Sequence, residues 1–345
     1  IKKIPRSISA LQYLNEVDVR NNVIGALPAS VTKLKKLSSL NVSDNRLKTL
    51  PKTIHKASGL ETCVVSNNKI KKLPKNIGHK GNISHMNLSD NKLTKLPEEI
   101  DRLQRLTFIN VSHNKLKTLP TALGSLKYLH HLDVSHNQLP TIPDGIGALK
   151  KLRCLFLSCN KLVNLPQDMN ELVSLQQLDI SSNQLHSLRP LIGLLHLETL
   201  NASKNRIATL PQEMDSLRWL FILNLADNDL ASIPPSIGHM KSLKQLYLQR
   251  NHLETLPTTL GEDQLLQVID VSHNELIELP EDLRKWRTME QVGISGNSIN
   301  ALPGNVGRLK LLETFDASNN QIEGLPQQIS LLTNLRQLYL QNNAI

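Results

Sequence analysis

Four side chains near the middle of the chain are of the types that bind zinc. They are His131, His136, Cys154 and Cys159, and each cysteine follows one of the histidines by 23 residues. Zinc is held by nitrogen and sulfur ligands that converge tetrahedrally, usually from turns that fold around the ion. The regular spacing instead places these residues on neighbouring parallel segments at a fixed lateral distance. We therefore expect them to form part of a binding surface and predict no metal site.

Carboxylates that could serve in acid–base catalysis also recur along the chain. Asp18, Asp133, Asp179, Asp270 and Asp316 occupy the same position in different copies of one sequence unit, which indicates a repeat consensus and not a catalytic pair. The sequence contains no phosphate-binding loop GxxxxGK[ST], no HExxH zinc helix and no GxSxG nucleophile elbow. It therefore predicts no enzyme active site and no cofactor.

The repeat that positions all these residues is marked by asparagine. Thirteen of its fourteen intervals are 23 residues long, and the interval from Asn183 to Asn205 is 22. The unit reads LxxLxLxxNxLxxLPxxI, as in residues 37–54. Such self-similarity indicates a solenoid, in which each repeat contacts only its neighbours. The asparagines of the series are Asn22, Asn45, Asn68, Asn91, Asn114, Asn137, Asn160, Asn183, Asn205, Asn228, Asn251, Asn274, Asn297, Asn320 and Asn343.

The spacing within the unit predicts the elements of the fold. The LxL alternation is typical of a short strand with one inward and one outward face. We expect about fifteen such strands, stacked in parallel, to line the concave side of an α/β horseshoe-shaped solenoid with short helical turns on its convex side. The asparagine amide should satisfy backbone groups at the bend, and the proline six residues later should stop the strand.

Composition and the chain ends limit the remaining possibilities. Hydrophobic residues make up 39% of the chain but aromatic residues only 3%, so thin aliphatic layers must fill the core. No apolar run is long enough for a transmembrane helix, and three cysteines cannot form a disulfide framework, which favours a reducing, cytoplasmic compartment. The chain starts and stops in mid-repeat at Ile1 and Ile345. We therefore expect one domain over residues 1–345, excerpted from a longer protein.

The full unit, seen in LPEEIDRLQRLTFINVSHNKL, resembles the leucine-rich repeats of one intracellular group. It is similar to the Ras-group leucine-rich repeat proteins, which include the Sur-8-type Ras–Raf scaffold and plant intracellular relatives, and to Scribble- and Erbin-type polarity scaffolds. The resemblance covers all 345 residues, but the matching residues are structural. It implies protein-binding scaffolding and signal transduction, often around small GTPases.

Candidate binding residues are those that depart from the small polar background of the expected concave face. One cluster includes two rings, Phe108 and Phe156, among histidines and a cysteine. A second cluster in the C-terminal half centres on Tyr247 and Arg250, and such residue types are enriched at interface hot spots. The first cluster consists of His85, Phe108, His113, His131, His136, Cys154 and Phe156.

Charge is distributed unevenly along the chain. Residues 1–120 contain 22 Lys and Arg against 8 Asp and Glu, although the whole chain has a net charge of only +10. Arg46, Lys69, Lys92 and Lys115 each follow an asparagine of the repeat, so they should form one row, the basic edge. A row of one sign attracts acidic partners. The row has almost no interleaved aromatic residues for base stacking, so we do not expect nucleic acid as the partner.

Two classes of function remain open at this stage. The leading hypothesis is a non-enzymatic scaffold that binds proteins through its concave face and basic edge. The alternative is the recognition domain of a larger enzyme, such as a cyclase, phosphatase, kinase or GTPase, whose catalytic part lies outside this sequence.

Overall fold

A computed structural model of the chain describes residues 1–79, 81–262 and 265–345. The chain forms two compact units, Ile1–Leu175 and Gln176–Ile345. Each unit is a stack of coils in which every coil contributes one strand of three residues to a parallel sheet. The expectation of one domain over residues 1–345 stays a prediction.

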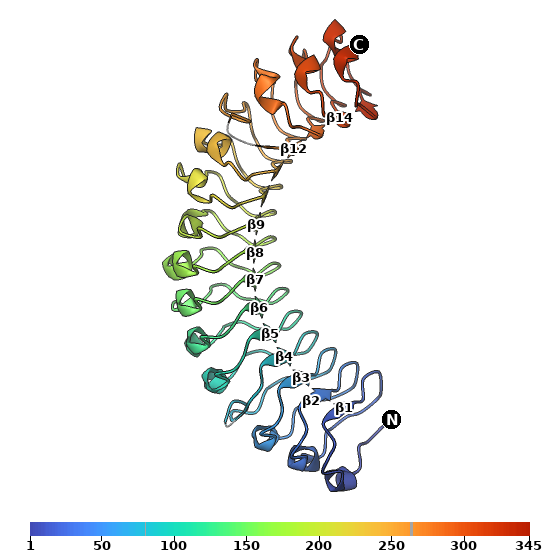
Figure 1. Cartoon of the computed structure of the whole chain (residues 1–345), viewed down its shortest axis with the longest axis vertical. Helices are drawn as coiled ribbons and strands as arrows, with labels where there is room; N and C mark the ends of the chain where they lie inside the picture. The colour runs from blue at the N-terminus through green and yellow to red at the C-terminus, as the bar shows by residue number, and fades with distance from the viewer. Residues whose placement is uncertain (80, 263–264) are drawn as a thin grey trace. The chain divides into compact units, whose positions relative to one another are not determined.

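The first unit contains seven strands in its described residues, paired in chain order and in register with one another. Figure 1 shows these strands on one side of the coils and short 3-10 helices on the opposite side. The strands are β1 (Glu16–Asp18), β2 (Ser39–Asn41), β3 (Thr62–Val64), β4 (His85–Asn87), β5 (Phe108–Asn110), β6 (His131–Asp133) and β7 (Cys154–Phe156). The helices are η1 (Arg6–Ala10), η2 (Ala29–Lys33), η3 (Ile54–Lys56), η4 (Glu98–Arg102), η5 (Thr121–Ser125), η6 (Ile146–Ala148) and η7 (Gln167–Glu171).

The second unit repeats this plan with eight strands in the part that the structure describes. The strands are β8 (Gln177–Asp179), β9 (Thr199–Asn201), β10 (Ile222–Asn224), β11 (Gln245–Tyr247), β12 (Val268–Asp270), β13 (Gln291–Gly293), β14 (Thr314–Asp316) and β15 (Gln337–Tyr339). The helices are η8 (Arg189–Leu191), η9 (Met214–Ser216), η10 (Pro235–His239), η11 (Leu283–Trp286), η12 (Val306–Arg308) and η13 (Gln327–Leu331).

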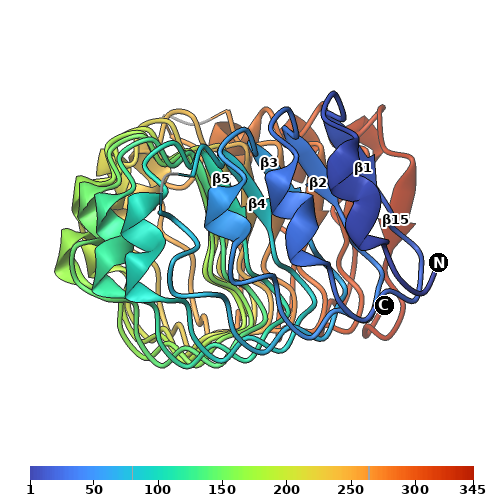
Figure 2. The same cartoon turned by 90° about the horizontal axis from the view of Figure 1, so that it is seen from below.

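The core of each coil is aliphatic, as the composition predicts. The middle residue of a strand points inward and is buried, as Leu40 and Ile109 are, while the residues on either side face outward. Figure 2 shows successive coils of the first unit, coloured blue to green, stacked one after another. Their inward residues are buried and in register from strand to strand. We call the outward side of the strands the sheet face. It corresponds to the expected concave surface.

The repeated asparagine joins each coil to the one before it. The Asn68 side chain accepts a hydrogen bond at Oδ1 from the Leu47 amide (2.8 Å) and donates through Nδ2 to the carbonyl oxygens of Val42 (2.9 Å) and Val65 (3.1 Å). The same set of bonds recurs at asparagines in both units, for instance at Asn114 and Asn274. Leaving one such buried group unpaired costs about 1–3 kcal/mol. The predicted role of the asparagine is confirmed.

Proline shapes the side of the coil opposite the strand. Pro28 and Pro97 directly precede η2 and η4 with φ near −70°, the angle that the proline ring imposes. The predicted short helical turns are confirmed as 3-10 helices of three to five residues. The 22-residue repeat absorbs its deletion at η8, because β8 and β9 still pair in register and the Leu185 amide still donates to Asn205 (3.0 Å).

The residue before each asparagine of the repeat has a positive φ. The non-glycine residues in this column have φ between 48° and 59°, and Gly296 has 67°. Asn, Asp, His and Gly tolerate this left-handed region best, whereas most side chains are strained there by about 1–3 kcal/mol. The column therefore holds its side chains in one fixed direction at the edge of the sheet face.

Candidate functional site

Four aromatic rings form a continuous stack on the sheet face of the first unit. The rings of His85 and Phe108 stack with centroids 4.4 Å apart and planes 2° apart, and those of Phe108 and His131 with 4.4 Å and 17°. Phe156 completes the row, tilted by 51° at 5.3 Å from His131. We call these four residues the ring ladder. Stacked aromatic pairs contribute about 0.5–1.5 kcal/mol beyond the area they bury.

Strand register explains the ladder. His85, Phe108 and His131 are the first residues of β4, β5 and β6, and each is paired with the next in the parallel sheet. Neighbouring strands lie about 4.8 Å apart, which is close to the stacking distance of two rings. Phe156 is the third residue of β7 and pairs with Asp133, so it approaches His131 diagonally. His85 is exposed, and the other three rings are half-buried, so none belongs to the core.

Electrostatics favour a neutral ring at the centre of the ladder. Burial lowers the pKa of His131 below its usual 6.5, the Asp133 carboxylate opposes this shift, and His85 adds to it. Cys154 pairs with His131 across β6 and β7, and burial raises the pKa of its thiol. The surface of the ladder is therefore mainly apolar at neutral pH.

His113 and His136 form a second stack beside the ladder. Their centroids are 4.0 Å apart with planes 12° apart, and both residues have φ near 52°. Parallel stacked rings direct their nitrogen lone pairs side by side and not toward a common point, so the two cannot chelate one ion. Cys159 occupies the same column in the next coil. Within the described ranges, no group of three His, Cys, Asp or Glu side chains is arranged to hold a metal ion.

Polar residues beside the ladder form hydrogen bonds within their own coils. Asn110 and Asp133 each accept hydrogen bonds through Oδ1 from the backbone amide and the hydroxyl of the serine two residues later, at 2.7–2.9 Å. Phe156 stands in this same column but has no oxygen to offer Ser158. Phe156 thus replaces a structural hydrogen bond with an accessible ring.

The Tyr247–Arg250 cluster lies on the sheet face of the second unit. Tyr247 pairs with Asn224 and Asp270, and its hydroxyl donates to Gln245 (3.2 Å). Arg250 forms an ion pair with Asp227, with Nε and Oδ1 3.9 Å apart. These polar groups therefore find partners within the cluster, in contrast to the rings of the ladder.

The backbone of the basic edge is held by hydrogen bonds, and its side chains are exposed. The amides of Arg46, Lys69, Lys92 and Lys115 donate to carbonyl oxygens of the preceding coil at 2.8–3.0 Å, and all four side chains are exposed. None of the four forms an ion pair within the part of the chain that the structure describes. Two coils carry both features, because His85 and Lys92 share one coil and Phe108 and Lys115 share the next.

Sequence reasoning missed the aromatic residues at the other ends of the strands. Tyr128 is 51% exposed and lies under the Lys151 ammonium, which is 4.3 Å from the ring centroid. Trp219 is 56% exposed at the matching position of its own coil in the second unit. The signal was their place in the repeat, directly before the leucine that leads into the strand, but only positions around the asparagine were considered.

Comparisons with known proteins support the assignment of the repeat. Residues 58–116 match the family model described as leucine rich repeat, and residues 106–187 match a leucine-rich repeat region. No curated protein sequence matches the chain. The coils are thus leucine-rich repeats, and the fold is a solenoid of about fifteen of them.

Solved structures show the same architecture. A leucine-rich repeat protein of Leptospira interrogans is 27% identical with a TM-score of 0.87, and the match covers 98% of this chain and 93% of that one. The plant peptide hormone receptor RGFR1, in complex with RGF2, is 25% identical with a TM-score of 0.72, over 99% of this chain and 65% of the receptor. The ectodomain of the Arabidopsis thaliana receptor kinase GASSHO1/SCHENGEN3 is 28% identical with a TM-score of 0.68, over 99% and 48%.

Two general properties follow. Leucine-rich repeat solenoids commonly serve as protein-binding scaffolds, because their strands present an extended surface. Among the described residues, no helix has the length and apolar character needed to cross a membrane.

Proposed function

We propose that this chain is a non-enzymatic scaffold that binds a protein partner through the ring ladder and the basic edge. The ladder carries the proposal, because stacked rings on a protein surface form an apolar patch in an otherwise polar setting. His113 and His136 extend this patch along the same coils, and Cys154 borders it. The partner would place apolar side chains against the rings.

The partner is acidic where it meets the basic edge. The ring ladder precedes the asparagine of a coil and the basic edge follows it, so a ligand that touches both must extend over the bend between them. A folded domain or a helix presents a surface large enough to do so. Contact with the rings would supply affinity, and the lysines would supply long-range attraction.

The setting of this interaction is proposed from the family resemblance. The Ras-group pattern of the repeats supports a role in signal transduction with a small GTPase among the partners, in the cytoplasm. The three free cysteines are consistent with a reducing compartment. We further propose that the two units act as one binding domain over residues 1–345, and that Tyr247 and Arg250 form a secondary contact.

A capture experiment with matched variants tests the proposal. The purified chain, the double variant Phe108→Ala/Phe156→Ala and the control Tyr128→Ala are immobilised, and the proteins retained from a cell extract are quantified by mass spectrometry. A specific partner should be retained by wild type and Tyr128→Ala and reduced about 30-fold by the double variant. Equal retention by all three, with unchanged circular dichroism and thermal unfolding, would contradict the proposal.

The alternative of a larger enzyme has its own test. The complete coding sequence around these 345 residues either contains a catalytic domain or does not. A cyclase, phosphatase, kinase or GTPase domain on the same chain would make this array a recognition domain and not an independent scaffold.

A further inference from the structure

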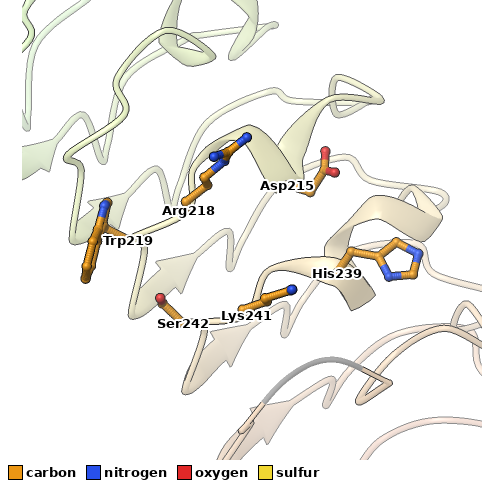
Figure 3. Close-up of a pocket in the computed structure, with 6 residues that line it drawn as sticks. All are labelled: Asp215, Arg218, Trp219, His239, Lys241 and Ser242. Carbon is orange, nitrogen blue, oxygen red and sulfur yellow. The ribbon is translucent and has the colours of Figure 1, made fainter.

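A surface hollow lies on the second unit, away from the sheet face. It is formed where two successive coils run from their 3-10 helices, η9 and η10, toward β10 and β11. Figure 3 shows Asp215, Arg218 and Trp219 on one coil and His239, Lys241 and Ser242 on the next, with Trp219 at one end of the row. The volume of the hollow is about 620 Å³, enough for several side chains of a bound peptide.

Trp219 differs from the other tryptophan of the chain. Trp286 is 1% exposed and its indole nitrogen donates to the Leu260 carbonyl oxygen (3.1 Å), so it is a core residue. Trp219 is 56% exposed. A tryptophan placed in this way is the residue type most enriched at the centres of protein interfaces.

The coil with Tyr128 has a lysine over its aromatic ring, and the hollow has no such cover over Trp219. Tyr128 and Trp219 occupy the same position of the repeat, and Lys151 of the following coil lies over the Tyr128 ring. The residue that corresponds to Lys151 in the coil after Trp219 is Ser242, which is too short to cover an indole ring. The chain therefore covers one aromatic face with its own cation and leaves the other open.

Apolar side chains continue the surface next to Trp219. Phe221, two residues on, is 36% exposed, and Leu195 in the preceding coil is 53% exposed. The backbone around them is fixed by two hydrogen bonds. The Phe221 amide donates to the Glu198 carbonyl oxygen (2.8 Å), and the Phe221 carbonyl oxygen accepts from the Lys244 amide (2.9 Å). Backbone hydrogen bonds thus fix the positions of three exposed apolar side chains on two successive coils, and Trp219 among them lines the hollow.

Three cations and two carboxylates surround these apolar side chains, the second carboxylate being Glu198 in the coil before Phe221. Arg218 and Lys241 line the hollow, and Lys244 follows in the coil of Lys241. Asp215 is the acidic residue of the lining, and no ion pair joins it to Arg218 or Lys241 within the described ranges. This local excess stands out because residues 121–345 carry 18 Lys and Arg against 22 Asp and Glu.

We propose that this hollow is a second protein-binding site, which takes an acidic peptide segment that carries an aromatic or large aliphatic side chain. The apolar side chain would pack on Trp219, Phe221 and Leu195, and flanking carboxylates would lie near Arg218, Lys241 and Lys244. The site requires neither the ring ladder nor the basic edge, since its residues all belong to the second unit.

A direct test uses the full chain and a labelled peptide, acetyl-Glu-Asp-Phe-Leu-Asp-Glu-amide. Fluorescence anisotropy gives its affinity, and tryptophan emission locates the contact, because Trp286 is shielded and the peptide has no tryptophan. Binding should shift the emission of wild type and leave that of Trp219→Phe unchanged. Trp219→Ala should weaken binding about tenfold or more, and Arg218→Glu/Lys241→Glu by a similar factor that shrinks as salt is added.

Matched variants and peptides show whether binding is specific to this hollow. Tyr128→Ala and Lys127→Glu change the equivalent positions of the first unit and should leave peptide affinity unchanged. The peptides Glu-Asp-Ser-Gly-Asp-Glu and Lys-Lys-Phe-Leu-Lys-Lys should bind far more weakly. The proposal is overturned if the first peptide does not bind wild type, if Trp219→Ala binds it equally well, or if the acidic peptide without apolar residues or inorganic phosphate competes as effectively. Failure of the ring-ladder experiment would leave this result untouched.

Discussion

The sheet faces of the two units use the same repeat and treat their exceptional residues differently. In the first unit the ring ladder replaces small polar residues with rings that stack on one another. In the second unit Tyr247 donates to Gln245, and Arg250 lies beside Asp227. The polar groups of the second cluster already have partners within the fold, so under the proposed function we expect the first unit to provide more of the binding free energy.

The edges that follow the asparagines differ in the same way. The column that holds Lys69 and Lys92 in the first unit holds Asp229, His252 and Glu275 in the second. His252 Nδ1 and Glu275 Oε1 lie 2.9 Å apart, so this carboxylate has a polar partner in the preceding coil. The same position of the repeat therefore holds exposed cations without an ion pair in one unit and a paired carboxylate in the other, within the described residues.

The largest expected effect concerns charge. Changing Lys69, Lys92 and Lys115 to Glu should slow association with the partner on the order of tenfold or more, because the exposed row attracts acidic groups over a Debye length of about 8 Å. Dissociation should change little. Stopped-flow or surface-based kinetics at low and high salt measure both rates. The matched reversal Glu254→Lys/Glu275→Lys/Glu278→Lys should leave association nearly constant, and an equal loss in both variants would remove the distinction between the edges.

The next effect is on stability, at the column that Phe156 and Tyr247 share. An Asn there can accept the hydrogen bond from the backbone amide two residues later, as Asn110 does at 2.8 Å. Phe156→Asn should therefore be about 1 kcal/mol more stable than Phe156→Ala, and Tyr247→Asn should exceed Tyr247→Ala similarly. Urea unfolding followed by circular dichroism gives the four free energies.

Both Phe156 variants should lose partner binding even though one of them is the more stable. Two variants of equal stability at position 156 would mean that Ser158 does not use the restored oxygen. Retained binding by Phe156→Asn would show that the ring itself is dispensable.

A smaller effect should appear with pH. Because the pKa of His131 is lowered in the folded state, the unfolded chain binds more protons as pH falls through 6.5, and stability is lost over that range. His131→Gln, which places the residue found at Gln177 and Gln245 of the second unit, should reduce this loss. Unfolding curves at neutral pH and at about one pH unit below 6.5 give the loss of unfolding free energy for wild type and variant. The idea fails if wild type and variant lose stability in parallel.

The smallest effect is expected at the ion pair of the second unit. Arg250 and Asp227 are exposed and 3.9 Å apart, so a double-mutant cycle with alanine should give a coupling of about 0–1 kcal/mol. Thermal unfolding of the two single variants and the double variant measures it. A coupling well above that range would show that this cluster is held more tightly than its exposure suggests.

Much of the fold could be predicted because a single residue type has a single physical task in each coil. The period of Asn45 and its equivalents predicted the coils, and the LxL parity correctly placed Phe108 and Phe156 outside the core. The stacking of His85, Phe108 and His131 could not be predicted, because it depends on side-chain rotation within a column. Trp219 lies nine residues before its asparagine, outside the positions from which binding residues were predicted, and Ser242 in the next coil is too short to cover it.

The reach of the asparagine bonds has a consequence for how such a chain grows. Asn68 bonds to groups 21 and 26 residues back and to its own coil, and to nothing more distant. A coding segment for 23 residues can therefore be duplicated or lost without creating a new kind of junction, whereas a shift of a few codons between strand and asparagine leaves one amide without its acceptor. Between strand and asparagine the length of a coil is therefore fixed, whereas the opposite side tolerates change, as the one-residue deletion at η8 shows.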